Sequence, residues 1–368
     1  MKTAVIGLGI GLAHVAGYLR SPHSELVRVC DLQPERLTHL GGTFDQGSMR
    51  VLEPLFTPVE RASPWEALGI TPTTDLDAIL NDPTIELVSL CTPDYTHADL
   101  AQKILRAGKH LLLEKPLALN LDDARTVLRC GGQMQKRIAV DYEFRVNPAV
   151  QKLRRLVTDG TLGTIRAFAL YHYRTPFRRD KWNHWIQSEN LSGGLLIEET
   201  CHWFDLAEFI TGNRITSVHA VGTDAIHPDF DYEDLAFVQG TYADGSVYQI
   251  SHALTGFDFS LVIQLHGDCG SAWCGLKEAS YSALDDGASP YLGIVSHAPQ
   301  NALPSEAHIR TYGTEATEPE NIRVYTESVV EALENDTPFV ADQDAGLRSL
   351  LVALAAREAL KKGEIVTI

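Results

Sequence analysis

The stretch "TAVIGLGIGLAH", residues 3–14, decides the fold because a short apolar run ends in glycines that lead directly into a helical pattern. Glycines at such a junction let the backbone turn tightly and approach a pyrophosphate, whose charge the N-terminus of the next helix favours. The spacing departs from GxGxxG, since the third glycine is Gly11 and Leu12 follows it, so we expect a turn one residue tighter. The dinucleotide contacts predicted from this loop are Gly7, Gly9, Ile10 and Gly11.

An acidic residue strengthens this interpretation. Asp31 ends the second apolar run, about where a carboxylate would bond the ribose 2′-hydroxyl of NAD. A carboxylate there repels the 2′-phosphate of NADP, but Arg36 lies near enough in the sequence to weaken that preference. The alternative is a glycine-rich turn beside an unrelated surface aspartate. Because strand, glycines, helix and acid occur in order, we expect NAD as the cofactor and NADP as the second candidate.

The first 145 residues alternate strand and helix patterns. After the glycine loop, a helix start is expected at Gln33–Pro34, and residues 41–74 are irregular. Further apolar runs occur in ELVSLC, HLLLEK and RIAVDY, with helical patterns at 97–107 and 121–133 between them. Strands that are buried on both faces and joined by helices predict a doubly wound parallel sheet. We therefore predict an α/β Rossmann domain that binds NAD(P), residues 1–143.

The pattern changes after Asn147–Pro148, where residues 144–368 are expected to form a second, α+β domain. The alternating stretch TIRAFALYHYR and four strand patterns between 215 and 266, with turn signals between them, predict a large, mainly antiparallel open sheet. Residues 276–320 are expected to be mostly loop. Helical patterns are expected at 148–159, 194–205, 322–335 and 343–361.

Composition excludes several partners. The chain has 368 residues and a formal net charge of −17, which disfavours nucleic acid and anionic membrane surfaces. Its six cysteines are scattered without a CxxC pair, as expected for reduced, buried thiols. The N-terminus is not expected to be a signal peptide, and no apolar run approaches membrane-spanning length. We expect a cytoplasmic enzyme.

The stretch "GLLIEETCHWFD", residues 194–205, is predicted to be a single, mostly apolar helix. Glu198, His202 and Asp205 are spaced four and three residues apart, so they would share one face of that helix. Buried charge is costly, which leaves a catalytic role, an internal ion network or a metal site. We assign no metal, because no further cluster of ligands is evident in the sequence. Asp205 alone could be structural.

Four motifs make the chain resemble the glucose–fructose oxidoreductase / inositol dehydrogenase (Gfo/Idh/MocA) family from end to end. "CTPDYTHADL" resembles the family's TPxxxH segment, and "AGKHLLLEKPLALN" resembles its AGKHVxxEKP signature. "FRVNPAVQKLRRLVTDGTLGTIR" is similar to the start of its second domain. "SGGLLIEETCHWFD" is similar to its GGxxxDxxxHxxD helix, with Glu198 in place of the usual Asp.

The resemblance implies a catalytic site made by both domains. Lys115 of the EKP motif and His202 would meet over the cofactor, with His202 as general base and the ammonium of Lys115 favouring the ionised hydroxyl. Glu198 would orient the imidazole, support its cation or bind a substrate hydroxyl. The resemblance also assigns the following residues to the cofactor site: Thr92, Pro93, His97 and Glu114.

The loop "RTPFRRDKWNHWIQSEN", residues 174–190, leads into residues 194–205 and is expected to cover the substrate. Trp182 and Trp185 could stack on a sugar ring, and His184 could bond its hydroxyls. Alternatively, these tryptophans pack at a domain or oligomer interface. Arg145 could contact the cofactor or the substrate, and the sequence does not decide between them.

We interpret the chain as an NAD(P)-dependent dehydrogenase that oxidises a secondary alcohol of a sugar, sugar acid or cyclitol. One alternative is an NAD-dependent glycosidase or lyase in which transient oxidation leaves the cofactor bound and unchanged overall. Another is a non-catalytic nucleotide sensor or assembly protein, against which the presence of both Lys115 and His202 counts. The resemblance implies that the second domain, residues 144–368, binds the substrate and forms contacts between copies of the chain. The expected partners are therefore a small polyol or sugar substrate and further copies of the chain, as a homodimer or homotetramer.

Overall fold

The computed structural model describes residues 1–43, 48–174, 182–254, 260–277, 291–296, 306–311 and 317–368. Contacts divide the chain into two compact units. The first contains Met1–Glu143 and Glu318–Leu347, and the second contains Phe144–Thr317 and Arg348–Ile368. Each unit is described by itself.

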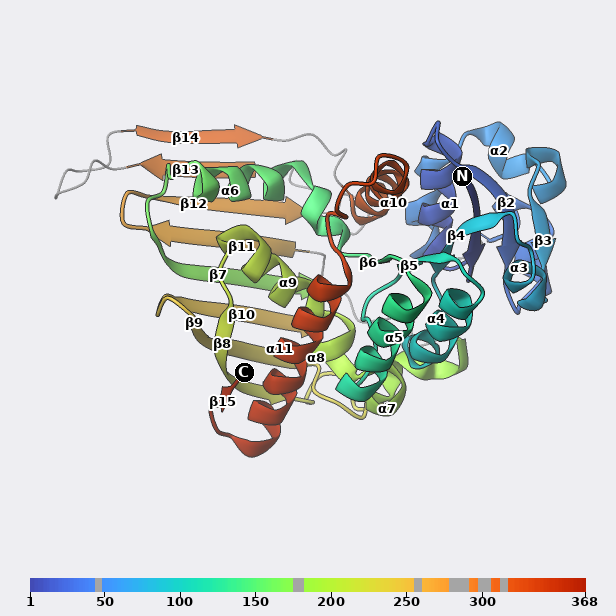
Figure 1. The fold of residues 1–368 in the computed structure, drawn as a ribbon. Helices are drawn as coiled ribbons and strands as arrows, with labels where there is room; N and C mark the ends of the chain where they lie inside the picture. The colour runs from blue at the N-terminus through green and yellow to red at the C-terminus, as the bar shows by residue number, and fades with distance from the viewer. Residues whose placement is uncertain (44–47, 175–181, 255–259, 278–290, 297–305, 312–316) are drawn as a thin grey trace. The chain divides into compact units, whose positions relative to one another are not determined.

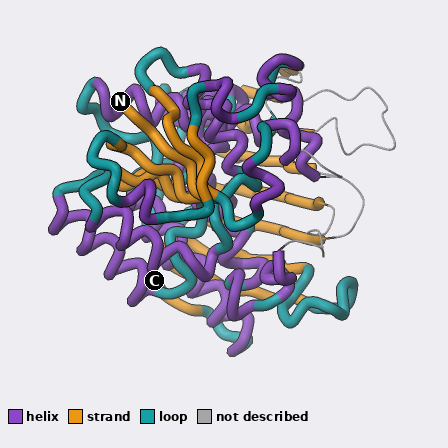
Figure 2. Tube along the Cα trace, turned by 90° about the vertical axis from the view of Figure 1, so that its right-hand side faces the viewer, coloured by secondary structure: helices purple, strands orange, loops and turns teal. Residues whose placement is uncertain are grey.

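The first unit is built on a six-stranded, fully parallel sheet. In spatial order its strands are β3 (Thr71–Thr73), β2 (Glu25–Cys30), β1 (Lys2–Ile6), β4 (Ile85–Leu90), β5 (His110–Leu113) and β6 (Ile138–Val140). Figure 2 looks onto this unit, with its strands running side by side among helices and loops. The order 3-2-1-4-5-6 is that of dinucleotide-binding folds, and it confirms the predicted doubly wound sheet.

The helices of the first unit are α1 (Gly11–Arg20), α2 (Pro58–Ala62), α3 (Asp77–Leu80), α4 (His97–Arg106), α5 (Leu121–Met134) and α10 (Glu318–Glu334). From residue 97 onward, the helices lie close to where the sequence predicted them. The Asn120 side chain accepts a hydrogen bond from the Asp123 amide and so caps α5. After β2, the helix expected at Gln33–Pro34 is only the short 3-10 helix Pro34–Leu37. The described residues between 41 and 74 form α2, β3 and further 3-10 turns.

Helix α10 packs against α1, although the sequence placed residues 318–347 in the second domain. The contact depends on Gly17, because a Cβ added there would lie 2.6 Å from Cβ of Thr326. Tyr325 donates a hydrogen bond to the carbonyl of Val140 or Ala341, each 2.7 Å from its hydroxyl. Sequence order alone could not reveal that this late helix returns to the first unit.

The second unit contains a nine-stranded mixed sheet that is mainly antiparallel, as predicted. Its order is β14 (Glu306–Thr311), β13 (Tyr291–Ser296), β12 (Gly270–Lys277), β11 (Ser260–Gly267), β7 (Ile165–Arg174), β10 (Val247–Leu254), β9 (Leu235–Tyr242), β8 (Ile215–Thr223) and β15 (Val366–Thr367). Strands β7 and β10 form the one parallel pair of this described sheet. Strands β13 and β14 lie in the region that was expected to be mostly loop.

Helices cover one face of this sheet. Figure 1 shows α6 (Pro148–Thr158), α9 (Thr200–Thr211) and α11 (Gln343–Lys362) over the strands. Inward side chains such as Phe168, Leu170 and Ile263 are buried against them. Helix α11 begins in the first unit, and its residues from Arg348 onward belong to the second.

The prediction of one helix over residues 194–205 is wrong. The chain forms α8 (Gly194–Glu198) and α9, with Glu199 between them at φ −115° and ψ −45°. Glu198 and His202 are therefore not on one face of a continuous helix. Four-residue spacing predicts a shared face only where every intervening residue is helical.

Candidate active site

The glycine loop combines two close backbone approaches with one open position. Gly7 has φ +91°, and a Cβ there would lie 2.2 Å from the carbonyl oxygen of Cys91. A Cβ on Gly11 would lie 3.0 Å from Cβ of Cys91, whereas one on Gly9 would meet nothing within 4 Å. Gly7 and Gly11 thus serve packing. Gly9 leaves the open backbone that a pyrophosphate requires.

Asp31 is held at this loop by backbone groups. Its Oδ2 accepts a hydrogen bond from the Leu8 amide at 2.7 Å, and its Oδ1 accepts one from the Gln33 amide at 2.8 Å. Arg36 Nη1 lies 3.3 Å from Oδ2 of Asp31. The loop, the acid and the arginine that the sequence predicted are therefore brought together in one place, and they fit a dinucleotide.

The buried His97 ring joins the segment that contains Thr92 to the segment that contains Pro116. The ring is fully buried, with Nδ1 2.8 Å from the carbonyl oxygen of Pro116 and Nε2 2.8 Å from that of Thr92. Burial lowers the pKa of His97. Because both ring nitrogens are engaged with backbone, its contacts favour a positioning role for the segments that carry Thr92 and Lys115.

A buried polar network that sequence reasoning missed surrounds His14. Its Nε2 lies 3.2 Å from Oε1 of Glu114 and 3.2 Å from Oδ2 of Asp141. Its Nδ1 lies 3.1 Å from Oγ of Ser89, which is 2.6 Å from the Tyr18 hydroxyl. The only sequence signal was a histidine in an otherwise apolar helix directly after the glycine loop. Glu114, predicted to bind cofactor, instead has its carboxylate turned toward this network.

Burial and charge shift the pKa values in this network. Burial opposes the charged imidazole, yet the thiol and two carboxylates around it hold the pKa of His14 well above its usual range. Burial raises the pKa of Asp141 to about 7, against the opposing hydrogen bond from His14. Burial also opposes ionisation of Glu114, but the His14 hydrogen bond keeps its pKa below the usual value. The network therefore holds one carboxylate charged and one close to titration at neutral pH.

In the second unit, His202 lies in an aromatic environment near the start of α9. Its ring is 5.7 Å from that of Phe144 and 5.6 Å from that of Trp203, centroid to centroid. Both His202 and Glu198 are buried. Low local polarity strengthens any interaction that the imidazole makes with a developing charge. His202 and Lys115 belong to different units, and their pairing stays a prediction.

Arg145 pairs with Asp205. Its Nε and Nη2 donate to the two carboxylate oxygens at 2.8 and 2.6 Å, and its guanidinium lies 4.7 Å from the Phe209 ring centroid. Burial raises the pKa of Asp205 although the guanidinium opposes that shift. A fork-to-fork pair of this kind fixes α9 against the chain before α6. These contacts favour a structural role for both residues.

The expected substrate loop is only partly described. Trp185 is buried, and His184 is exposed with φ +53°. Trp182 begins a 3-10 helix, Trp182–Gln187, and its side chain lies outside the described part of the structure, as do residues 175–181.

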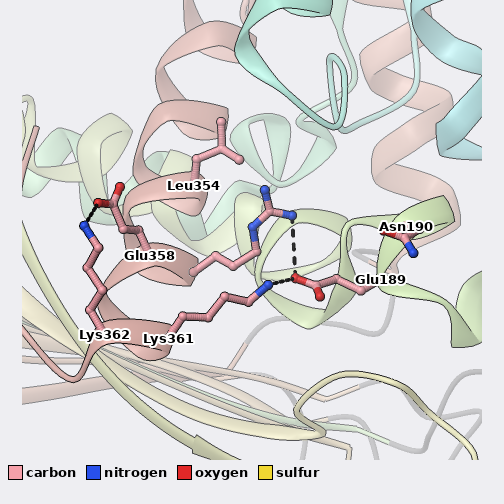
Figure 3. Close-up of a pocket in the computed structure, with 7 residues that line it drawn as sticks. Glu189, Asn190, Leu354, Glu358, Lys361 and Lys362 are labelled. Carbon is pink, nitrogen blue, oxygen red and sulfur yellow. Dashed lines mark hydrogen bonds and ion pairs between the residues drawn. The ribbon is translucent and has the colours of Figure 1, made fainter.

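A surface hollow of about 580 Å³ lies in the second unit, and Glu189 and Asn190 at the end of the expected substrate loop line part of it (Figure 3). Its charges pair with one another: Lys361 and Arg357 lie 2.7 and 3.7 Å from Oε1 of Glu189. It is lined by Glu189, Asn190, Leu354, Arg357, Glu358, Lys361 and Lys362. The hollow is rich in paired charges and contains none of the predicted catalytic groups, so we do not assign the reaction to it.

Comparison with known proteins identifies the family. Residues 1–142 match the model described as an oxidoreductase family with an NAD-binding Rossmann fold, and residues 150–273 match the GFO/IDH/MocA C-terminal domain. The chain belongs to the Gfo/Idh/MocA family of oxidoreductases. The prediction of an NAD(P)-dependent oxidoreductase of CH–OH groups is confirmed at this level.

Three relatives illustrate the similarity. The chain is 27% identical over 296 residues to an inositol 2-dehydrogenase of Rhizobium meliloti, covering 79% of this chain and 83% of the relative. It is 28% identical over 188 residues to the scyllo-inositol 2-dehydrogenase (NADP(+)) IolW of Bacillus subtilis, covering 48% and 52%. The WlbA dehydrogenase of Bordetella pertussis, solved with NADH and UDP-GlcNAcA, has a TM-score of 0.76 at 19% identity over 100% of this chain and 97% of that one. Among the described residues, no helix is long and apolar enough to cross a membrane.

Proposed function

We propose that this chain is a dehydrogenase that oxidises a secondary alcohol of a sugar, sugar acid or cyclitol, with NAD or NADP as hydride acceptor. The observation that carries the proposal is the 2.7 Å bond from the Leu8 amide to Asp31, which holds a carboxylate at the glycine loop of an NAD-binding family. The inositol dehydrogenases among its relatives support a polyol substrate.

The cofactor site that we propose lies in the first unit. Gly7, Gly9, Ile10 and Gly11 would accommodate the pyrophosphate, and Asp31 would bond the ribose hydroxyls. The ion pair of Arg36 with Asp31 partly neutralises that carboxylate, so NADP stays a candidate. Thr92 and Pro93 would contact the cofactor directly, while His97 and Glu114 would position the loops around it.

The proposed chemistry separates a proton from a hydride. When bound, the nicotinamide accepts the hydride from the carbinol carbon. His202 takes the hydroxyl proton as general base, and the Lys115 ammonium stabilises the negative charge that develops on the oxygen. Glu198 supports the imidazolium or bonds a neighbouring hydroxyl. Trp182, His184 and Trp185 are the proposed substrate contacts, with Arg145 contributing by fixing Asp205 on α9.

Two larger-scale features complete the proposal. The functional domains divide between residues 143 and 144, with α10 added to the nucleotide-binding domain. The uncovered face of the nine-stranded sheet binds a second copy of the chain.

The test is a panel of sugars, uronates and inositols assayed with NAD⁺ and NADP⁺ for reduced cofactor. We expect reduced cofactor to form in proportion to substrate consumed. His202→Ala and Lys115→Met should each lower turnover by about 10²–10⁴-fold while NAD affinity changes little. His266→Ala, at an exposed histidine on β11, is the matched control and should keep full turnover.

Two outcomes would redirect the assignment. Product formation without net reduced cofactor would favour the glycosidase or lyase chemistry in which the hydride is returned. Full turnover of His202→Ala would remove His202 from the mechanism.

A further inference from the structure

Three buried side chains of the second unit converge beneath α9. His172 on β7 and His252 on β10 are direct register partners of the parallel strand pair, with ring centroids 4.8 Å apart. Glu199 occupies the break between α8 and α9, and α9 lies over these strands (Figure 1). One ligand atom from each residue lies within 4.8 Å of the others, and all three side chains are buried.

Hydrogen bonds fix where the hydrogens of both imidazoles lie. Nδ1 of His172 is 3.2 Å from the carbonyl oxygen of Ser260, and a carbonyl can only accept, so this nitrogen donates. A neutral His172 with its hydrogen on Nδ1 presents a lone pair at Nε2.

The same argument shows where the hydrogen of the His252 ring lies. The Thr200 hydroxyl donates its one hydrogen to the carbonyl of Leu195 at 2.9 Å. Nδ1 of His252, 2.9 Å from that hydroxyl oxygen, must then be the donor. A neutral His252 ring with its hydrogen on Nδ1 presents a lone pair at Nε2. Within the described residues, this buried Nε2 has no hydrogen-bond partner.

Two of these acceptors are spaced as ligands of one cation would be. Nε2 of His172 lies 3.5 Å from Oε1 of Glu199. Ligand atoms around a tetrahedral zinc with bonds of about 2.0–2.1 Å are roughly 3.3 Å apart. Each ring also donates its other N–H to an oxygen, which is the usual outer arrangement of metal-binding histidines.

Two neighbouring side chains support these ligands: Trp203 shields them from water, and Arg174 orients the carboxylate. The Trp203 ring is fully buried and lies 4.5 Å from the His172 ring. Arg174 Nη1 is 2.7 Å from Oε1 of Glu199 and orients the carboxylate, as hydrogen bonds to metal-bound carboxylates commonly do. The rival account is a metal-free ion network in which Arg174 supplies the positive charge.

We propose that His172, Glu199 and His252 bind a divalent transition-metal ion through two imidazole Nε2 atoms and one carboxylate oxygen. The ion takes no part in hydride transfer. It ties β7 and β10 to the start of α9, three residues before His202. The ligands are scattered over 80 residues of sequence, which is why sequence analysis found no metal cluster.

The other buried group of ligand-type residues, His14, Cys91 and Glu114, does not offer the same arrangement. Nε2 of His14 already lies between two carboxylates, and its Nδ1 faces Ser89. A ring nitrogen that lies between two carboxylates donates its hydrogen to them and presents no lone pair there.

The experiment measures metal in the purified full-length protein. Elemental analysis should find about one zinc per chain, and chelation followed by Co²⁺ should give the visible absorption of tetrahedral cobalt. His252→Asn and His172→Asn keep a donor near the Nδ1 position but remove Nε2. Each should weaken Zn²⁺ binding at least about tenfold. His266→Asn and Cys91→Ser are the matched controls and should bind Zn²⁺ like the wild type.

Thermal unfolding provides a second readout that is independent of activity. Added Zn²⁺ should raise the Tm of the stripped wild type and leave that of His252→Asn unchanged. The proposal is overturned if the stripped wild type gives neither the Co²⁺ spectrum nor the Zn²⁺-dependent Tm. It is equally overturned if Cys91→Ser, rather than the histidine variants, abolishes binding. The wild-type spectrum decides the matter even if a histidine variant fails to fold.

Discussion

At the scale of single residues, we propose that Asp31 determines which cofactor the glycine loop accepts. Its two carboxylate oxygens accept hydrogen bonds from the amides of Leu8 and Gln33, which fix the position of the side chain. A substitution can therefore change the charge of this side chain without moving it. Asp31→Asn keeps the shape and removes the charge. We expect kcat/KM for NADP⁺ relative to NAD⁺ to rise about 10–100-fold, since a charge-assisted hydrogen bond contributes about 1.5–3 kcal/mol.

The control for this change is Asp77→Asn, at the first residue of helix α3 in the same unit. Steady-state kinetics with both cofactors should show no shift for it. An unchanged cofactor ratio in Asp31→Asn would remove Asp31 from ribose recognition.

The network around His14 predicts that stability falls as pH rises through neutrality. Folding raises the pKa of both His14 and Asp141, so the folded state binds more protons, and this stabilisation is present at low pH. It is lost as pH rises through the folded values, about 7 for Asp141. The Tm should therefore fall between pH 5 and pH 8. Asp141→Asn, which cannot ionise, should make this fall shallower.

Asp99→Asn, at an exposed aspartate on α4, is the control and should follow the wild-type slope. Parallel Tm–pH profiles for the wild type and Asp141→Asn would contradict the coupling.

The sequence predicted the positions of single residues well where a motif determines their backbone contacts. That Asp31 lies at the glycine loop was predictable because this arrangement follows from local spacing. The roles of Arg145, Glu114 and His97 were harder to predict, since their partners Asp205, His14 and the Pro116 carbonyl are set by tertiary structure.

At the scale of elements, the contact of α1 with α10 predicts opposite effects for two glycine substitutions. Gly132→Ala, in an open exposed position of α5, should stabilise by up to about 1 kcal/mol because alanine is the better helix former. Gly17→Ala also replaces glycine with the better helix former, but its Cβ would lie 2.6 Å from Cβ of Thr326. It should destabilise by about 1–3 kcal/mol through overpacking.

Urea unfolding of both variants measures this difference, with Gly132→Ala acting as the matched control. If Gly17→Ala were as stable as Gly132→Ala, α10 would not pack on α1 in solution.

At the scale of elements, helices with a strong apolar periodicity could be predicted from the sequence, whereas the break between α8 and α9 could not. The helices at 97–107, 121–133 and 148–159 were confirmed within about a turn. The break at Glu199 has no glycine or proline beside it, so the local sequence carries no signal for it. The parallel pairing of β7 with β10 is likewise a tertiary choice that alternation along one strand cannot reveal.

At the scale of the whole molecule, the uncovered face of the nine-stranded sheet is the proposed contact between copies. Val221 and Phe237 face each other across β8 and β9, and with Val247 on β10 they are 52%, 40% and 49% exposed. Apolar side chains on an open sheet favour pairing with another surface. Phe237→Lys should reduce the molar mass measured by light scattering to that of one chain.

Val59→Lys, at an exposed valine of the first unit, should leave that mass unchanged. A wild type that is already monomeric would refute the proposal.

The meeting of Gly7 with the carbonyl of Cys91 bears on protein engineering. These two backbone segments leave no room for a methyl group between them. A glycine loop grafted from another oxidoreductase would therefore lack the segment that it packs against. Chimeras intended to alter nucleotide preference should therefore transplant both segments as a pair.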